Sequence, residues 1–180
     1  MLVVFSGLPG TGKSSLARLL APHLHGAYIR IDSVEAAILE TTAQTPGVTG
    51  YAAAYAIAAD NVGLGLNVVA DCVNPLAVTR QAWMDVADRA GVPLVNIEVL
   101  CSDQDEHRRR VTGRADEAAL YRGHVSPAWA PPTWESVQAS RQAFEPWAER
   151  RLVIDTAGQT VPEAFATLLA DLHLSYGVPA

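Results

Sequence analysis

The sequence predicts an α/β fold in which a parallel five-stranded sheet carries helices on both faces. Five short apolar runs occur along the chain, and helical patterns lie between them. Nearly continuous apolar runs of this kind are typical of parallel strands that are buried between two layers of helices. A glycine-rich segment directly follows the first run, where a strand would turn into a helix.

Each element is expected from its own pattern. The strand runs are LVVF at 2–5, AYIRI at 27–31, NVVA at 67–70, VPLVNIEVL at 92–100 and RLVI at 151–154. Helical patterns cover about 13–20, stopping near Pro22, then 33–40 with Ser33 as N-cap, 51–64, 76–90, 107–117 and 161–174. Glycine and proline interrupt the pattern between 115 and 132, which predicts a lid at approximately 113–133. No linker or repeat divides the chain, so one domain over 1–180 is expected.

Composition favours a globular cytoplasmic protein and gives no general reason to expect a polyanionic partner. The chain has 180 residues, a net charge of -6 and 49% apolar residues. No apolar run approaches the roughly 20 residues of a membrane span, and the start lacks the features of a secretory signal. Cys72 and Cys101 are too few for a disulfide framework and have no metal-site spacing. The negative charge gives no reason to expect nucleic acid, and the oligomeric state is left open.

The segment GLPGTGKSS matches the phosphate-binding pattern GxxxxGK[ST] in full. Its glycines let backbone N–H groups point at phosphate oxygens, and the helix that follows adds its positive end. Lys13 is expected to reach the β- and γ-phosphates, and the Ser14 hydroxyl to bind Mg²⁺. Lys13 is the only lysine among 13 basic residues, which indicates that a compact ammonium is needed there. The predicted nucleotide-binding residues of this segment are Gly7, Leu8, Pro9, Gly10, Thr11, Gly12, Lys13, Ser14 and Ser15.

Two aspartates follow neighbouring strand runs, Asp32 in RIDSVEA and Asp71 in VVADCVNP. A carboxylate at such a position commonly holds Mg²⁺ or accepts a proton from an attacking hydroxyl. Each is also explained by helix capping or a simple turn. Asn74 and Arg80, further along, fit either a ligand contact or an ordinary loop and helix. Whether Asp32 or Asp71 is the base stays open.

Together these segments resemble the small P-loop kinases that include chloramphenicol phosphotransferase, zeta-toxin-type kinases and gluconate kinase. The resemblance is carried by GLPGTGKSS, IDSVEAAI and VVADCVNPL and spans nearly the whole chain. It implies the three-layer P-loop NTPase fold of nucleoside monophosphate kinases, with sheet order 2-3-1-4-5 and a lid. It also implies ATP and Mg²⁺ as cofactors, with Asp32 as the base for the acceptor hydroxyl and Asp71 and Ser14 at the metal.

The segment Arg110-Val111-Thr112-Gly113-Arg114 is similar to the one that borders the lid of adenylate kinases. The resemblance implies that Arg110 stacks on adenine and that Arg114 contacts phosphate in a catalytic role. A guanidinium suits both tasks, because it is planar for stacking and forked for bidentate oxygen contacts. The kinase resemblance also implies that Thr156, Ala157 and Gly158, at the end of the last strand, line the adenine.

The stretch RLVIDTAG at 151–158 also looks like a GTPase switch, but three features argue against that reading. It follows the last strand run, far from the phosphate loop; no Asn-Lys-x-Asp segment exists in a chain whose only lysine is Lys13; and no threonine lies in a convincing first switch loop. The predicted activity is ATP-dependent transfer of the γ-phosphate to a hydroxyl of a small metabolite or antibiotic. The alternatives are a nucleotide-binding regulatory ATPase and a nucleic-acid end kinase. Tyr51 and Tyr55 fit the acceptor site and the core equally well.

Overall fold

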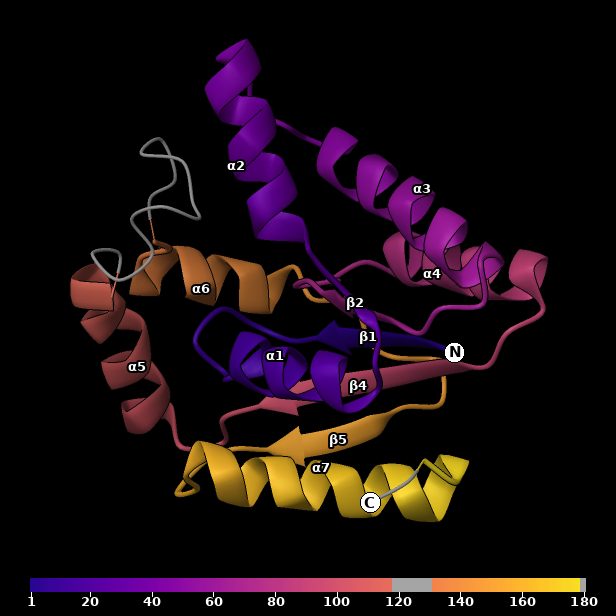
Figure 1. The fold of residues 1–180 in the computed structure, drawn as a ribbon. Helices are drawn as coiled ribbons and strands as arrows, with labels where there is room; N and C mark the ends of the chain where they lie inside the picture. The colour runs from indigo at the N-terminus through magenta and orange to yellow at the C-terminus, as the bar shows by residue number, and fades with distance from the viewer. Residues whose placement is uncertain (118–130, 179–180) are drawn as a thin grey trace.

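The computed structural model describes residues 1–117 and 131–178, and of residues 114–117 the backbone only. Its centre is a five-stranded sheet in the order β2-β3-β1-β4-β5, in which all neighbouring strands are parallel (Figure 1). Helices cover both faces of this sheet. The expected fold class and strand order are therefore confirmed.

The strands are β1 (Leu2–Ser6), β2 (Ala27–Arg30), β3 (Val68–Asp71), β4 (Leu94–Leu100) and β5 (Leu152–Asp155). The helices are α1 (Lys13–His23), α2 (Ile31–Thr42), α3 (Thr49–Gly63), α4 (Ala77–Ala90), α5 (Gln104–Glu117), α6 (Trp134–Gln142) and α7 (Val161–Tyr176). Among the described residues, none of these helices has both the length and the apolar character needed to cross a membrane.

Alternating side chains of the central strands build two cores, because successive residues of a strand point to opposite faces of the sheet. Val3 and Phe5 of β1 pack with α1 and α7 on one face, whereas Leu2 and Val4 pack with α3 and α4 on the other. Trp83 of α4 is fully buried in the second core. The two cores hold β1 at the centre of the sheet, so the loop that follows it starts from a rigid base.

Among the helix boundaries that differ from the sequence prediction are those at Pro22 and at Ser33. The first helix continues past Pro22 to His23, because the carbonyls of its last turn are bound by the N–H groups of Leu24, His25 and Gly26. The second helix begins at Ile31 with the extended Arg30 as its N-cap, so Ser33 lies inside the helix and the predicted Ser33 cap is wrong. The strand β2 passes into α2 without a linker, which places Asp32 in the first helical turn.

The loops at the carboxyl ends of the strands gather on one edge of the sheet, where α5 and α6 also lie (Figure 1). The α5 helix continues to Glu117, beyond the expected start of the lid. Residues 118–130 of the expected lid lie outside the described part of the chain, so the lid stays a prediction. Ligands of open parallel sheets bind at this edge, which is where the candidate site is sought.

Candidate functional site

The phosphate loop, Gly7–Gly12, joins β1 to α1 in a conformation that needs its glycines. Gly10 has φ +88°, and a Cβ on Gly7 would lie 2.3 Å from the carbonyl oxygen of Val99. No other residue type fits these positions without moving the backbone. Lys13 opens the helix, is 7% exposed, and donates from Nζ to the carbonyl oxygen of Leu8 at 2.9 Å. The loop therefore places the only lysine of the chain directly against its own backbone.

A cavity of about 340 Å³ borders the loop on the side of α5 and α7. Its lining combines the loop, the arginine-bearing helix and the segment after β5: Gly10, Gly12, Ser15, Leu16, Arg110, Thr156, Gln159, Thr160, Val161 and Ala164. Its size is at the lower end of the range for small-molecule sites. Arg110 and Thr156, which lie 46 residues apart in the sequence, meet here as the sequence predicted for a base-binding pocket.

Thr156 links the phosphate loop to this pocket through a network of hydrogen bonds. Its hydroxyl accepts from Nη1 of Arg110 at 2.7 Å and lies within donating distance of the carbonyls of Thr11 and Leu100, at 2.9 and 3.0 Å. The carbonyl of Thr156 accepts from Nη2 of Arg110 at 2.8 Å, and Glu106 accepts from the same nitrogen. The guanidinium is thus held at the wall of the pocket.

The other two residues predicted to line the base make structural bonds. The N–H of Ala157 donates to the Asp155 carboxylate at 3.1 Å, and the N–H of Gly158 donates to Glu106 at 2.9 Å. The latter bond lowers the pKa of Glu106. Neither residue is among those that line the cavity; both lie in the turn beside it, and their predicted contact with adenine stays a prediction.

Asp32 and Asp71 come together at the ends of adjacent strands through Arg30. The guanidinium of Arg30 contacts Asp32 at 2.8 Å and Asp71 at 3.9 Å. Asp71 is 3% exposed and also accepts a hydrogen bond from the Tyr28 hydroxyl at 2.7 Å; burial, and then the charge of Asp71, raise the pKa of Tyr28. The Asp32 side chain is 37% exposed. Asp32 is therefore accessible to a ligand, whereas Asp71 is enclosed.

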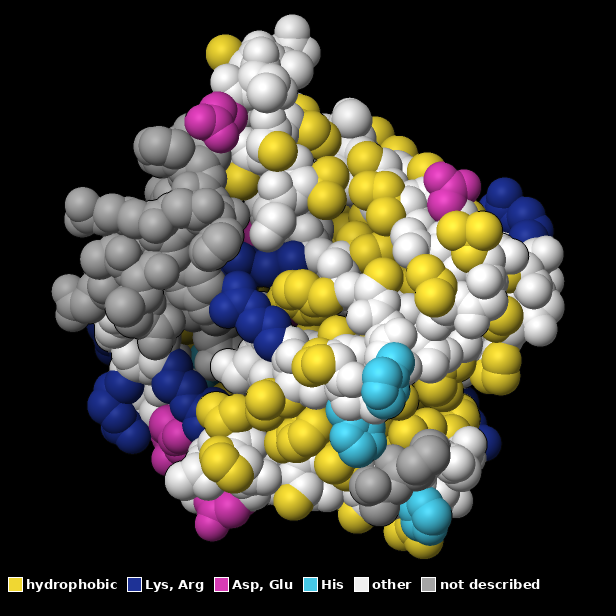
Figure 2. Space-filling model, in the orientation of Figure 1, with side chains coloured by type: hydrophobic (Ala, Val, Ile, Leu, Met, Phe, Trp, Pro, Cys, Tyr) yellow, Lys and Arg dark blue, Asp and Glu magenta, His cyan; other side chains and the backbone are white. Residues whose placement is uncertain are grey.

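The surface of the molecule differs in character between the hollow beside α2 and the face over α3. Figure 2 shows basic side chains gathered in a hollow between α2 and the phosphate loop, whereas the surface over α3 is largely apolar. Polyanionic ligands are attracted to such a hollow even though the chain as a whole is acidic.

The metal ligands predicted from the sequence are the Ser14 hydroxyl and the Asp71 carboxylate, on α1 and β3. These two elements contact each other. Mg²⁺ prefers oxygen donors and usually takes only one or two of them from the protein. A donor set of one hydroxyl and one carboxylate fits that preference. Among the described residues, no group of three or more His, Cys, Asp or Glu side chains could hold a metal ion by itself.

The residues whose roles the sequence left open prove to be structural. Arg80 is 1% exposed and bonds to Glu149 and to the carbonyls of Pro75 and Pro146, which ties α4 to the segment after α6. Asn74, fully buried with φ +53°, donates from its amide to Ser6 Oγ at 3.0 Å.

The two tyrosines of α3 also make structural contacts. The Tyr51 hydroxyl accepts from the Asn74 N–H at 2.9 Å. The Tyr55 hydroxyl donates to the Thr79 carbonyl at 3.1 Å, and its ring packs edge-on against Trp83. Both hydroxyls thus fix the loop after β3 and the start of α4, and neither tyrosine lines either cavity beside the loop.

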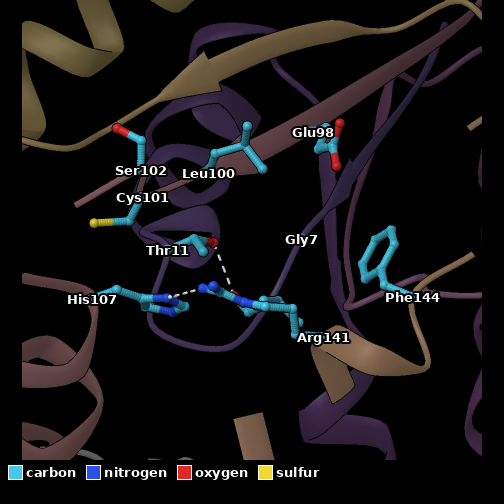
Figure 3. Close-up of a pocket in the computed structure, with 10 residues that line it drawn as sticks. Gly7, Thr11, Glu98, Leu100, Cys101, Ser102, His107, Arg141 and Phe144 are labelled. Carbon is cyan, nitrogen blue, oxygen red and sulfur yellow. Dashed lines mark hydrogen bonds between the residues drawn. The ribbon is translucent and has the colours of Figure 1, made fainter. Parts of the chain in front are cut away.

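His107 is a site residue that sequence reasoning missed. Its ring is 1% exposed, with Nε2 2.8 Å from the Pro9 carbonyl and Nδ1 3.3 Å from Nη2 of Arg141 (Figure 3). An arginine only donates, so Nδ1 accepts and Nε2 carries the proton that is donated to Pro9. Both side chains line a second cavity of about 340 Å³ together with Gly7, Leu8 and Thr11 of the loop. The sequence held one signal that could have indicated this role. His107 and Val111 are four residues apart, which places both on one face of the helix.

Arg114, predicted to contact phosphate, falls in the last turn of α5, and its side chain lies outside the described part of the chain. Of the three predicted catalytic residues, the structure describes the side chains of Lys13 and Asp32, and the phosphate contact of Arg114 stays a prediction. The remaining loop residues, Leu8, Pro9 and Thr11, face the second cavity or support it through backbone contacts.

The loop and its surroundings define a P-loop protein, and comparison with known families agrees. A family model described as an AAA domain (AAA_33) matches residues 2–125, so the chain belongs to that family. No curated protein matches the sequence.

Solved structures share the fold at low sequence identity. Kti12 from Chaetomium thermophilum, in complex with ADP-AlF3, has a TM-score of 0.67 and 19% identity, covering 94% of this chain and 98% of its own. The APS kinase CysC of Mycobacterium tuberculosis, with AMPPNP and APS, has 0.63 and 19%, covering 96% of each chain. A gluconokinase from Sinorhizobium meliloti 1021 has 0.60 and 17%, covering 97% and 96%. The predicted resemblance to small P-loop kinases is therefore confirmed at the level of the fold.

Proposed function

We propose that this protein is an ATP-dependent phosphotransferase that moves the γ-phosphate to a hydroxyl of a small molecule. The observation that carries the proposal is the placement of Asp32. It lies at the end of β2, partly exposed, and shares Arg30 with Asp71 of the adjoining strand. Asp71 is paired in register with Phe5 of β1, two residues before the phosphate loop. An accessible carboxylate thus lies two strands from the loop, where an acceptor hydroxyl would be activated.

In the proposed reaction Asp32 accepts the proton of the acceptor hydroxyl while the oxygen attacks the γ-phosphorus. The bond from the γ-phosphorus to the β,γ-bridging oxygen breaks, and ADP leaves with that oxygen. Arg30 donates to the Asp32 carboxylate at 2.8 Å and holds it in place. Lys13 balances the charge that develops on the transferred group and on the leaving oxygen.

The nucleotide base would occupy the cavity that Arg110 and Thr156 line. The hydrogen bonds of Arg110 to Thr156 keep its guanidinium plane fixed, which is what a stacking surface for a purine requires. The Ser14 hydroxyl and the Asp71 carboxylate would hold Mg²⁺, which would offset the negative charge of the phosphates. The hydroxyl of Tyr28 and the guanidinium of Arg30 orient the carboxylate of Asp71 for this purpose.

The acceptor is proposed to be a small hydroxylated metabolite. A gluconokinase and an APS kinase share this fold, and both are named as kinases of small molecules. Outside the arginine-rich segment 107–117, the sequence of this acidic chain carries no extended basic track that would bind a nucleic-acid strand, which disfavours the nucleic-acid end kinase.

The decisive experiment measures ATP consumption with and without pools of hydroxylated metabolites. We expect consumption to rise with one pool and to fall by about 10²–10⁴-fold in Asp32→Asn, the usual range for loss of a general base. The affinity for ATP should be nearly unchanged. Asp88→Asn, an exposed change on α4, is the matched control. ATP turnover that no acceptor stimulates would remove the support for a kinase.

A second candidate is a nucleotide-binding regulatory protein with slow hydrolysis and no dedicated acceptor. Kti12 favours it, because this neighbour is not named as a kinase and was solved with ADP-AlF3. Under this alternative, hydrolysis by the wild type would be independent of acceptors, and Asp32→Asn would change it little.

A further inference from the structure

His107 contacts the phosphate loop from outside the GxxxxGK[ST] segment. It belongs to the second turn of α5, 98 residues away in the sequence, and its Nε2–H donates to the Pro9 carbonyl at 2.8 Å. Two side chains of α6 hold the ring from other directions. Arg141 of α6 donates to Nδ1 at 3.3 Å, Trp134 of α6 packs edge-on at 5.3 Å between ring centroids, and only 1% of His107 is exposed. The donor is therefore rigidly placed.

Gly10 follows Pro9 and has φ +88°. The backbone of a glycine has more conformational freedom than that of any other residue. The carbonyl and the N–H of a planar trans peptide point in opposite directions. The bond that fixes the Pro9 carbonyl towards His107 therefore also directs the Gly10 N–H away from His107. Gly10 lines the cavity beside Arg110 and Thr156, whereas His107 lines the cavity on the other side of the loop.

The α5 helix packs so closely against Gly10 that there is no room for a side chain at this position. A Cβ on Gly10 would lie 2.5 Å from Cγ2 of Val111 and 3.2 Å from Cδ2 of His107. Val111, one helical turn after His107, is 2% exposed. Helix and loop thus meet in a close-packed contact that offers the Pro9–Gly10 peptide a single hydrogen-bonding partner on the α5 side among the described residues.

We propose that His107 is a positioning residue, which clamps the Pro9–Gly10 peptide so that the Gly10 N–H faces the phosphates of the bound nucleotide. This inference rests on the proposed nucleotide site. Without the hydrogen bond from His107 the Pro9–Gly10 peptide rotates. The Gly10 N–H then no longer faces the phosphates, and the phosphates contribute less to the binding of the nucleotide. The affinity for the base, which is bound on the Arg110 side, does not depend on the clamp.

The test compares His107→Phe, which keeps a ring against Trp134 but donates nothing, with His107→Gln, whose amide can still donate to Pro9. Calorimetry measures binding of an unreactive ATP analogue with Mg²⁺, and of AMP. We expect His107→Phe to weaken the ATP analogue by about tenfold, as for loss of one hydrogen bond to a charged group, and AMP by less than about twofold. His107→Gln should recover most of the loss. His173→Gln, at the exposed far end of α7, is the matched control.

The outcomes separate the two proposals. If the wild type binds no ATP analogue, the nucleotide site itself fails. If the wild type binds it and folded His107→Phe binds equally well, or loses ATP and AMP affinity in equal proportion, the clamp is overturned. Should His107→Phe not fold, His107→Asn replaces it, because its shorter amide cannot reach Pro9. Equal affinities of the Gln and Asn variants for the ATP analogue then overturn the clamp.

Discussion

Replacing Thr156 by valine tests the network that ties the phosphate loop to the base pocket. Valine keeps the branched shape of the side chain and removes only the hydroxyl. In the native protein this hydroxyl accepts from Arg110 at 2.7 Å and lies 2.9 Å from the Thr11 carbonyl, in a residue that is 4% exposed. The change therefore removes buried hydrogen bonds without leaving a cavity.

The expected cost follows from these contacts. A hydrogen bond to a charged group contributes about 1.5–3 kcal/mol, and a buried carbonyl left without a donor adds about 1 kcal/mol. Arg110 keeps its bonds to the Thr156 carbonyl and to Glu106. We therefore expect Thr156→Val to lower the free energy of unfolding by about 2–4 kcal/mol, with a fall in Tm of about 2–4 °C for each kcal/mol in a chain of this size.

Urea unfolding followed by circular dichroism measures the change, with Thr41→Val on the exposed face of α2 as control. The control should lie within about 0.5 kcal/mol of the wild type. A double-mutant cycle with Arg110→Met isolates the shared bond. The affinity for ATP should also fall, because the Thr11 carbonyl loses its tether. A loss below about 0.5 kcal/mol with unchanged ATP affinity would refute the network, since that is the range of a neutral surface change.

Three further predictions concern buried charges. Arg80→Met should lower the free energy of unfolding by about 3–5 kcal/mol, because it removes the hydrogen bonds that a guanidinium only 1% exposed donates to Glu149 and to the carbonyls of Pro75 and Pro146. The exposed Arg89→Met should cost under about 0.5 kcal/mol, and equal urea midpoints of the two variants would contradict this. Burial, and then the charge of Asp32, raise the pKa of Glu35 to about 6. The folded state therefore keeps this proton to a higher pH than the unfolded state, so the free energy of unfolding should fall as the pH rises from 4.5 to 6. Glu35→Gln should abolish that slope and stabilise the protein at pH 8. Burial and nearby cations lower the pKa of His107, so the unfolded state binds the extra proton and stability should fall as the pH drops below 6.5; a profile that His107→Phe leaves unaltered would contradict this.

Local patterns predicted the parts of this protein that local sequence determines. The phosphate loop was predicted because its glycines and Lys13 are adjacent in the chain and their chemistry requires that order. The central strands β1 and β3 were predicted because both of their faces are buried, so each is a nearly continuous apolar run. The strand order came from the resemblance to kinases, since apolar runs alone do not determine which strands are neighbours.

The parts that sequence reasoning missed depend on contacts between distant residues. In the sequence, His107 is one of several polar residues of a basic helix. Its contact with the Pro9 carbonyl arises only because α5 packs on the phosphate loop. For Arg80 and Asn74 the sequence left a ligand contact and an ordinary loop or helix position equally open, and the structure shows that both are buried and bind neighbouring segments. Ser33 has the chemistry of an N-cap, but the direct passage of β2 into α2 placed the helix start two residues earlier.

Binding of an unreactive ATP analogue with Mg²⁺ to the wild type and to Lys13→Met tests the central claim most directly. Methionine keeps most of the buried stem and removes the only ammonium side chain of the chain, so the fold should persist, as circular dichroism would show. The account predicts that the wild type binds the analogue and that Lys13→Met binds it at least about 10²-fold more weakly, because the lysine makes charge-assisted bonds to two phosphates. Equal affinity of the two folded proteins, or no binding by the wild type, would contradict it.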